Sequence, residues 1–519
     1  MISHSVIPRQ LFWKLAACAL LVLLAAILCG RISHPWTYND DYNGAFWSQA
    51  ARNLDRTGIL ANAGVPAPLY FGAPPIPAEA LYVHHPTLLA ELMVADLRLL
   101  GGSERAARCL PILFSLLTAA LLWSFAGRCA GWRGAAFILA FFIAAPMELH
   151  YGQMVNFEAP ELFFLLGALW AYHGWRREPG GRRAAACAAF CVAAMWMDWL
   201  GYLLVILLAL PLLTTRRRRD AEIAALLLMA ALLCGVAFLV QIKEALPGAW
   251  GELFRALRER GSHADLSGGV FTMTQWGQTE YEYLTTLYHP AAWLLAAAGA
   301  VAAWVGRGTL RPGEKALLHT GALLFAMDAI YVCGLRNQSY IHDFASFYFL
   351  VPVAIYAGFL IERMLRAART RWGSRTARVA ALACCVGTAL LIASGVMKLN
   401  GIDTQFCILD NDHSEPETLM PDVGRLIDAT FAPGAVVICN FDPYYSPLPF
   451  YARRVMVNDV DDPDAWEGAV RDAAPSPVGG IIWTSTAGAA ALLRHLPMEE
   501  TRQATVDGIP FVLWVPRPK

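Results

Sequence analysis

Long apolar runs alternate with short polar segments along residues 1–398. A helix needs about 17 to 25 mostly apolar residues to cross a bilayer, and most of the runs have that length. The pattern therefore predicts a polytopic α-helical membrane protein with about 11 transmembrane helices. The expected spans are 11–30, 106–127, 134–149, 157–174, 184–198, 200–215, 221–241, 290–306, 316–335, 344–362 and 380–397.

Basic residues gather after alternate runs and give the orientation. Arg128 and Arg133 follow the second run, and Arg216 to Arg219 follow the sixth. Lys and Arg in short loops mark the cytoplasmic side. This rule predicts a first external loop at 31–105 and a later one at about 242–289, whose first half is typical of an amphipathic helix lying on the membrane.

Two boundaries of this topology require a choice. The runs 184–198 and 200–215 are short, but merging them would put every later arginine cluster outside, so we predict two spans. Residues Arg31 to Pro35 offer no small-x-small cleavage site after the first run. We therefore expect an uncleaved signal anchor.

The pattern changes after Lys398, where apolar runs shorten to strand length and acidic residues outnumber basic ones. Short apolar strands alternating with helical stretches are typical of an α/β domain. We predict a transmembrane domain at 1–398 and a small extracytoplasmic, periplasmic α/β domain at 399–519. The expected strands are 435–439, 454–458, 479–484 and 510–515, and the expected helices are 418–430, 464–474 and 486–495.

Composition supports the membrane class, because the chain is 57% hydrophobic and only 16% charged. Its 41 basic and 41 acidic residues cancel, so bulk charge gives no reason to expect a nucleic-acid partner. Most of the 12 cysteines lie in or beside apolar runs, where they pack as small apolar residues. Cys407 and Cys439 lie in the polar region and are candidates for one disulfide.

Unusual polar residues collect beside the apolar runs on the predicted outer side. An acid near membrane depth costs about 2.5 to 3.5 kcal/mol, so such residues often mark a functional cavity. Taken singly, each acid is also typical of a helix end, and His84-His85-Pro86 of a turn that enters a helix. The candidate site residues are Asp40, Asp41, Tyr82, His84, His85, Asn156, Glu158, Asp198, Arg336, His342 and Asp343.

These residue types suit sugar transfer. A carboxylate can take the proton of an acceptor hydroxyl as it attacks an anomeric carbon, which contributes about 10²- to 10⁴-fold to a rate. If the leaving group is a phosphate, a cationic or imidazole side chain must stabilise it. The candidates for that role are Arg336, His342, His84 and His85.

Several stretches carry a resemblance to a known superfamily. They are the first loop from Arg31, "YVHHPTLLAEL" within 82–123, "YGQMVNFEAPELFF" at 151–164, "MDWLGY" at 197–202 and "YIHDFASFYFL" within 340–358. With them the chain resembles the GT-C membrane glycosyltransferases, which include protein O-mannosyltransferases and the aminoarabinose transferases of lipid A. The similarity covers most of residues 10–400.

The resemblance implies a reaction and a set of roles. An Asp just after the first span would be the catalytic base, here Asp41 or Asp40, with Asp41 favoured. The donor would be a sugar on a polyprenyl phosphate, transferred with inversion at the periplasmic side of a bacterial inner membrane to a glycan, lipid or protein acceptor. Some members bind a divalent cation near this loop, for which His84, His85 and Glu158 are possible ligands, although the spacing is not a zinc signature.

Two other functions fit the same residues. A transporter or flippase for polyprenyl-linked sugars would line a path with them, but it should place charges at mid-span and often shows internal repeats, neither of which the sequence displays. A non-catalytic assembly subunit would keep its phenotype after Asp40→Asn or Asp41→Asn.

Overall fold

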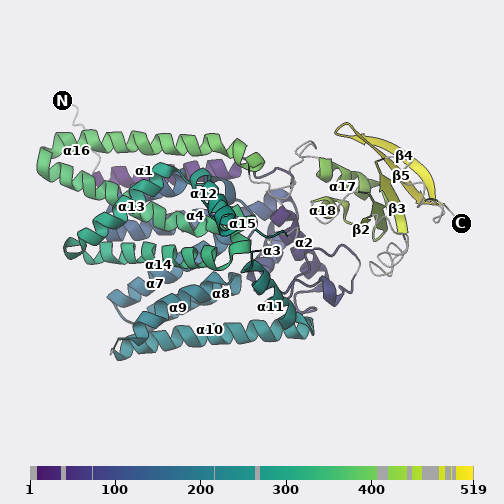
Figure 1. The fold of residues 1–519 in the computed structure, drawn as a ribbon, viewed down its shortest axis with the longest axis horizontal. Helices are drawn as coiled ribbons and strands as arrows, with labels where there is room; N and C mark the ends of the chain where they lie inside the picture. The colour runs from purple at the N-terminus through teal and green to yellow at the C-terminus, as the bar shows by residue number, and fades with distance from the viewer. Residues whose placement is uncertain are drawn as a thin grey trace.

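The computed structural model describes residues 9–36, 42–72, 74–215, 217–263, 269–405, 419–440, 447–458, 478–484, 493 and 498–517. Its larger part is a bundle of long helices, and its smaller part is a C-terminal sheet flanked by helices (Figure 1). Helices from the first loop lie between the two parts. The predicted combination of a helical membrane domain and an α/β region is therefore confirmed.

Every predicted span overlaps a helix. By length and apolar composition, five of the described helices could cross a membrane, or six if the bent pair of α12 and α13 forms one span. The number of spans therefore stays a prediction. The bundle helices are α1 (Arg9–Cys29), α4 (Glu104–Ala130), α5 (Trp132–Ala144), α7 (Glu158–Arg177), α8 (Gly181–Met197), α9 (Leu200–Leu213), α10 (Arg218–Ala245), α13 (Pro290–Val305), α14 (Pro312–Gly334) and α16 (Leu350–Gln405).

Two span predictions need correction. The segment 134–149 is not one helix, because α5 ends at Ala144 and α6 (Pro146–Tyr151) begins at a proline, which lacks the N–H that would continue the hydrogen-bond ladder. The arginine-rich stretch between the last two predicted spans is not a loop. The helix runs on through it and turns only at Gly373, whose positive φ of 84° is a conformation that glycine adopts without strain.

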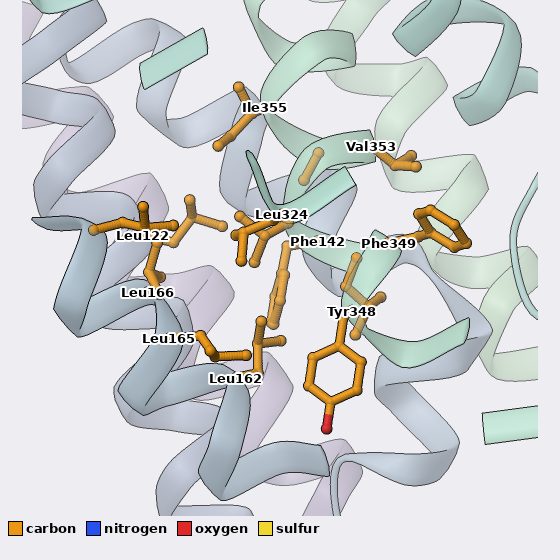
Figure 2. Packing of buried hydrophobic residues seen from close by; sticks show 14 of the residues in the cluster. Leu122, Phe142, Leu162, Leu165, Leu166, Leu324, Tyr348, Phe349, Val353 and Ile355 are labelled. Carbon is orange, nitrogen blue, oxygen red and sulfur yellow. The ribbon is translucent and has the colours of Figure 1, made fainter. Parts of the chain in front are cut away.

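The bundle core is formed by large apolar side chains from α4, α5, α7, α14 and α16. Figure 2 shows Leu162, Leu165 and Leu166 of α7 facing Phe142 of α5. These side chains are almost completely buried. Lipid is as apolar as leucine, so close van der Waals packing, more than the hydrophobic effect, holds such helices together.

Shorter helices cover the end of the bundle that faces the sheet. The first loop contains α3 (Leu88–Leu100), and the predicted amphipathic helix of the later loop is present as α11 (Ala249–Arg260). Helix α2 (Tyr42–Thr57) was not predicted. The remaining short elements are η1 (Ala78–Ala80), α12 (Met273–Thr286), η2 (Arg307–Thr309), α15 (Arg336–Ile341) and η3 (Asp343–Phe349), of which η2 lies at the opposite end.

The C-terminal sheet has strand order β2-β1-β3-β5-β4 in the described residues. Strand β1 pairs in parallel with β2 and β3, and β5 pairs antiparallel with β3 and β4. All four predicted strands are confirmed, as is the predicted helix 418–430. The elements are α17 (Leu419–Thr430), β1 (Val436–Cys439), α18 (Leu448–Ala452), β2 (Val455–Asn458), β3 (Val478–Trp483), β4 (Met498–Val506) and β5 (Ile509–Pro516).

Strand β4 was not predicted, because most of its side chains are polar and exposed. The predicted helix 464–474 lies outside the described residues, as does nearly all of 486–495. Cys407 also lies outside them, so the disulfide with Cys439 stays a prediction.

Candidate active site

His85 lies at the centre of a buried polar chain at the sheet-facing end of the bundle. Its Nδ1 is 2.7 Å from Oδ1 of Asp198, and its Nε2 is 2.7 Å from Nη1 of Arg260. Arginine has only donors, so Nε2 must accept and the ring proton must sit on Nδ1, from which it is donated to Asp198. The chain carboxylate–imidazole–guanidinium therefore fixes one tautomer of a neutral histidine.

The three residues of this hydrogen-bonded network come from three separate parts of the structure. His85 belongs to the segment that precedes α3, Asp198 lies in the turn between α8 and α9, and Arg260 is the last residue of α11. Asp198 has extended backbone and its N–H closes the final turn of α8 on the carbonyl of Ala194. A basic residue at a helix C-terminus is favoured by the helix dipole, which suits Arg260.

Aromatic rings enclose the imidazole of His85. It is stacked between Tyr82, at 5.8 Å between ring centroids, and Phe157, at 4.6 Å. Burial lowers the pKa of His85, and the charge of Arg260 adds to this effect while Asp198 opposes it. Burial and Arg260 also lower the pKa of His84, to about 4, so both imidazoles are neutral at pH 7.

A second group of polar contacts, which includes carboxylates, lies beside the His85 network. Trp47 Nε1 donates to Asn156 Oδ1 at 3.1 Å, and Asn156 Nδ2 donates to Glu158 Oε1 at 3.3 Å. Glu158 Oε2 is buried and has no hydrogen-bond partner among the described residues. Asp198 and Asp343 are close enough for their charges to act on Glu158, and Asp343 accepts a hydrogen bond from Tyr151. The site therefore keeps one carboxylate oxygen unused.

His342 and Arg336 were both predicted as site residues, and they differ in how close they lie to the Asp198–His85–Arg260 network. Burial lowers the pKa of His342 to about 3, and the charge of nearby Arg260 adds to this effect. Arg336 begins α15 and donates to the sulfur of Met273 at 3.7 Å. Among the described residues, Arg336 forms no hydrogen bond or ion pair with His85 or Asp198. Of the predicted phosphate-binding residues, His342 therefore lies at the site and Arg336 lies beside it.

Asp40 and Asp41 lie outside the described residues. The chain is described again from Tyr42, which begins α2 and to which Asp41 is bonded. The Tyr42 ring lies 5.7 Å from Phe46, whose ring lies 5.3 Å from Tyr82. The helix that follows the two acids therefore packs against the loop of His85.

The suggested metal ligands differ in how well they fit a cation. Both ring nitrogens of His85 are engaged, one of them by a guanidinium, so His85 does not fit a metal ligand in this arrangement. Glu158 fits better because one of its oxygens is unpaired. Within the described ranges, no group of three or more His, Cys, Asp or Glu side chains is arranged to hold a metal ion.

Arg260 is the principal site residue that the sequence analysis missed. Nothing in its local sequence distinguishes it from Arg255 and Arg258 on the same helix. The available signal was indirect: Arg260 ends an amphipathic helix on the side where the other candidates collect. Trp199, which follows Asp198, contributes a different contact: its Nε1 donates to the carbonyl oxygen of His84 at 3.0 Å.

Solved structures of other proteins share this architecture over nearly the whole chain. ArnT from Cupriavidus metallidurans in the apo state has a TM-score of 0.59 at 15% identity, covering 99% of this chain and 100% of that one. The same protein bound to undecaprenyl phosphate has a TM-score of 0.60 at 16% identity, covering 98% and 99%. The Archaeoglobus fulgidus oligosaccharyltransferase, tethered with an acceptor peptide, has a TM-score of 0.55 at 11% identity, covering 90% and 68%.

The chain has the GT-C fold. No family model and no curated protein matches the sequence. At these identities the likeness is one of fold, so the chemistry of this GT-C chain must be argued from its own residues.

Proposed function

We propose that this protein is an inverting glycosyltransferase that moves a sugar from a polyprenyl-phosphate donor to an acceptor. The GT-C fold supports a transferase that uses a lipid-linked donor, since one structure with this fold is ArnT bound to undecaprenyl phosphate. Residues at the sheet-facing end of the bundle support the same proposal, because they combine a fixed guanidinium with nearby carboxylates.

The observation that carries the proposal is the chain Asp198–His85–Arg260. Asp198 and His85 are almost fully buried, and their contact fixes the imidazole that holds the guanidinium. A guanidinium with five donors suits phosphate oxygens, and Arg260 shares hydrogen bonds only with His85 and the Tyr82 side chain among the described residues, which leaves donors for a phosphate. We therefore assign Arg260 to the phosphate of the donor, with His84 and His342 as neutral donors beside it.

The charge that develops in the reaction matches this assignment. A sugar on a polyprenyl phosphate is a phosphodiester with one negative charge, whereas the released monoester carries up to two. Arg260 thus interacts more strongly with the leaving group than with the bound donor. Only such differential stabilisation accelerates the chemical step, and its removal typically costs about 10²- to 10³-fold.

The proposed step is a single displacement at the anomeric carbon. The acceptor oxygen forms a bond to that carbon, the bond to the phosphate oxygen breaks, and the hydroxyl proton passes to Asp41. Asp40 is the alternative base. Attack opposite to the leaving phosphate inverts the anomeric configuration, since no covalent sugar–enzyme intermediate intervenes.

Two further features belong to the proposal. A divalent cation is a possible addition, with Glu158 as its candidate ligand, and no step above depends on it. The reaction is proposed for the periplasmic side of a bacterial inner membrane, because the arginine clusters mark the other end of the bundle as cytoplasmic. A glycan, lipid or protein acceptor would approach from the side of the C-terminal domain.

A transfer assay tests the proposal. The protein in nanodiscs is incubated with a radiolabelled polyprenyl-phosphate sugar and a cell-envelope acceptor fraction, with and without chelator. Wild type should move label from the carrier to the acceptor and release polyprenyl phosphate, and Arg260→Gln should do so at least about a hundredfold more slowly. Arg98→Gln is the matched control, because Arg98 lies in α3 and forms an exposed ion pair with Asp55.

The rival functions predict other outcomes. A flippase would carry labelled donor across a sealed vesicle with its sugar–phosphate bond intact. An assembly subunit would leave label on the carrier in every condition. Either result would refute the proposed enzyme.

A further inference from the structure

A second buried carboxylate of α7, Glu161, lies three residues after Glu158 and has a hydrogen bond at each of its oxygens. Its Oε1 accepts from the backbone N–H of Gly201 at 3.1 Å, and its Oε2 accepts from the hydroxyl of Tyr348. The side chain of Glu161 is completely buried. Because a side chain without exposed surface does not touch a substrate, its role must follow from the two groups that it holds.

The first of these groups belongs to the turn that presents Asp198. Gly201 lies in the first turn of α9, where backbone N–H groups have no partner within the helix, and a carboxylate there is also favoured by the helix dipole. The turn is tightly closed, since a Cβ at Gly201 would collide with the backbone nitrogen of Met195. Asp198 lies between Met195 and Gly201. Glu161 therefore holds against α7 the turn from which Asp198 reaches His85.

The second group belongs to the segment that carries the other predicted site residues. Tyr348 is almost fully buried in η3, which begins at Asp343, directly after His342. Figure 2 shows the Tyr348 ring beside the apolar cluster, with its hydroxyl directed away from the labelled leucine side chains. Glu161 thus joins the Asp198 turn to η3, although it belongs to neither of them.

We infer that Glu161 is a positioning residue of the donor site, which holds Asp198 in place relative to η3 and so sets how the Asp198–His85–Arg260 network meets the donor phosphate. The inference rests on the proposed function, in which Arg260 stabilises the leaving phosphate. Glu161 acts on Asp198 through the backbone of its turn, and Asp198 acts on Arg260 through the imidazole of His85. Residues that orient a ligand-binding side chain typically contribute about 10- to 100-fold.

The kinetic test compares the loss of both hydrogen bonds with the loss of one. Glu161→Leu should lower kcat by about 10- to 100-fold and change the KM for the donor less, because the network favours the leaving group over the bound donor. Tyr348→Phe should cost less, since the contact with Gly201 remains. Glu161→Gln should regain most of the rate, because its oxygen can accept from Gly201 and its amide N–H can donate to the Tyr348 oxygen.

Tyr356→Phe is the matched control for the loss of a buried tyrosine hydroxyl. The Tyr356 hydroxyl donates to the carbonyl oxygen of Leu318 at 3.0 Å, a contact between α16 and α14 that includes none of the site residues. This variant should keep the wild-type kcat.

A double-mutant cycle separates positioning from a general weakening of the fold. If Glu161 acts through Asp198, adding Glu161→Leu to Asp198→Asn should lower kcat little further than the larger single change does. Two independent losses would multiply instead. Multiplied losses would therefore overturn the inference.

A binding measurement tests the inference without any transfer. In neutral-lipid nanodiscs, Glu161→Leu should weaken the binding of polyprenyl phosphate without sugar by about tenfold, and Tyr356→Phe should match wild type. If thermal unfolding shows that Glu161→Leu does not fold, Tyr348→Phe takes its place with a smaller loss. Weaker binding that Glu161→Gln restores would support the inference.

The outcomes separate this inference from the proposed function. Equal affinities in wild type, Glu161→Leu and Tyr348→Phe would overturn the inference and leave the proposed enzyme standing. A wild type that binds polyprenyl phosphate but transfers no sugar would refute the proposed function alone. A wild type that does not bind polyprenyl phosphate would overturn both.

Discussion

The two ends of the helix bundle use their charges in different ways. At the end with the arginine clusters, Glu362 accepts hydrogen bonds from Arg133 at 2.7 Å and from Arg366 at 2.8 Å. Glu314 accepts from Arg366 at 2.6 Å and from Arg311 at 2.9 Å. The arginine side chains of this network are 23% to 56% exposed. Both carboxylates are buried, and each is paired with guanidinium groups that reach the surface.

At the sheet-facing end the charges are buried and incompletely paired. The side chains of His85 and Asp198 are 8% and 7% exposed, and one oxygen of Glu158 has no partner among the described residues. Exposed ion pairs add about 0 to 1 kcal/mol each, whereas burying charges costs several kcal/mol that their attraction does not always offset. The two ends thus differ in pairing: an unpaired buried carboxylate oxygen indicates a binding site, whereas buried carboxylates that are fully paired with arginines reaching the surface indicate a topology signal.

The largest effect is expected from the acidic pair. Asn in place of the base keeps the size of the side chain but cannot take the proton, so Asp41→Asn should lower single-turnover transfer by about 10²- to 10⁴-fold. Asp40→Asn should cost less if Asp41 is the base. Asp55→Asn in α2 is the control and should keep the wild-type rate, and equal losses in Asp41→Asn and Asp55→Asn would exclude the assignment.

The next effect concerns how Arg260 is held. In Asp198→Asn the amide can donate to Nδ1 of His85, which would move the ring proton to Nε2, facing the donors of Arg260. We expect kcat to fall by about 10- to 100-fold, the range typical of residues that orient a ligand-binding side chain. Steady-state kinetics measure it, and an unchanged kcat would show that the buried chain does not position Arg260.

The opposite end should tolerate the same kind of change. Arg133→Gln leaves Glu362 its hydrogen bond from Arg366, so we expect a loss of at most about 1 kcal/mol in stability and an unchanged transfer rate. Thermal unfolding in detergent and the transfer assay measure the two quantities. A rate loss as large as that of Arg260→Gln would remove the contrast between the ends.

The smallest effect is a pH dependence. Because the pKa of His84 is about 4 in the folded protein against 6.5 in the unfolded chain, the unfolded state binds more protons between these values. The contribution of His84 to stability is thus complete above pH 6.5 and is lost as the pH falls toward 4. The drop in Tm from pH 7 to pH 5 should be smaller in His84→Asn by about 1 °C, and equal drops would contradict the shift.

The sequence predicted those parts of the fold that local patterns determine. Apolar runs between arginine clusters locate the bundle helices, and runs such as 435–439 locate the buried strands. The sequence analysis did not predict strand β4, because its polar side chains give no apolar strand pattern at the edge of the sheet. The only local signal is Asp507-Gly508, both at positive φ, which marks its hairpin turn. The continuation of α16 to Gly373 was not predicted, because the arginines there were interpreted only as topology signals, although arginine is also a good helix former.

The sequence predicted which residues lie at the site but not how they contact one another. The membrane sidedness rule brought His85, Asp198 and Glu158 to one end, but no local pattern pairs His85 with an aspartate 113 positions away. Arg260 had no signal of its own, because its role comes from where α11 ends against the His85 loop. Such contacts depend on tertiary packing, which sequence periodicity does not encode.

The central claim is that the buried Asp198–His85–Arg260 network, and not the arginine clusters, binds the donor phosphate. The most direct test is the affinity of the protein in neutral-lipid nanodiscs for a polyprenyl phosphate without sugar, compared among wild type, Arg260→Gln and Arg133→Gln. A hydrogen bond to a charged group contributes about 1.5 to 3 kcal/mol, so Arg260→Gln should weaken binding by about 10- to 100-fold while Arg133→Gln matches wild type. Equal affinities in wild type and Arg260→Gln, or a loss only in Arg133→Gln, would contradict the claim.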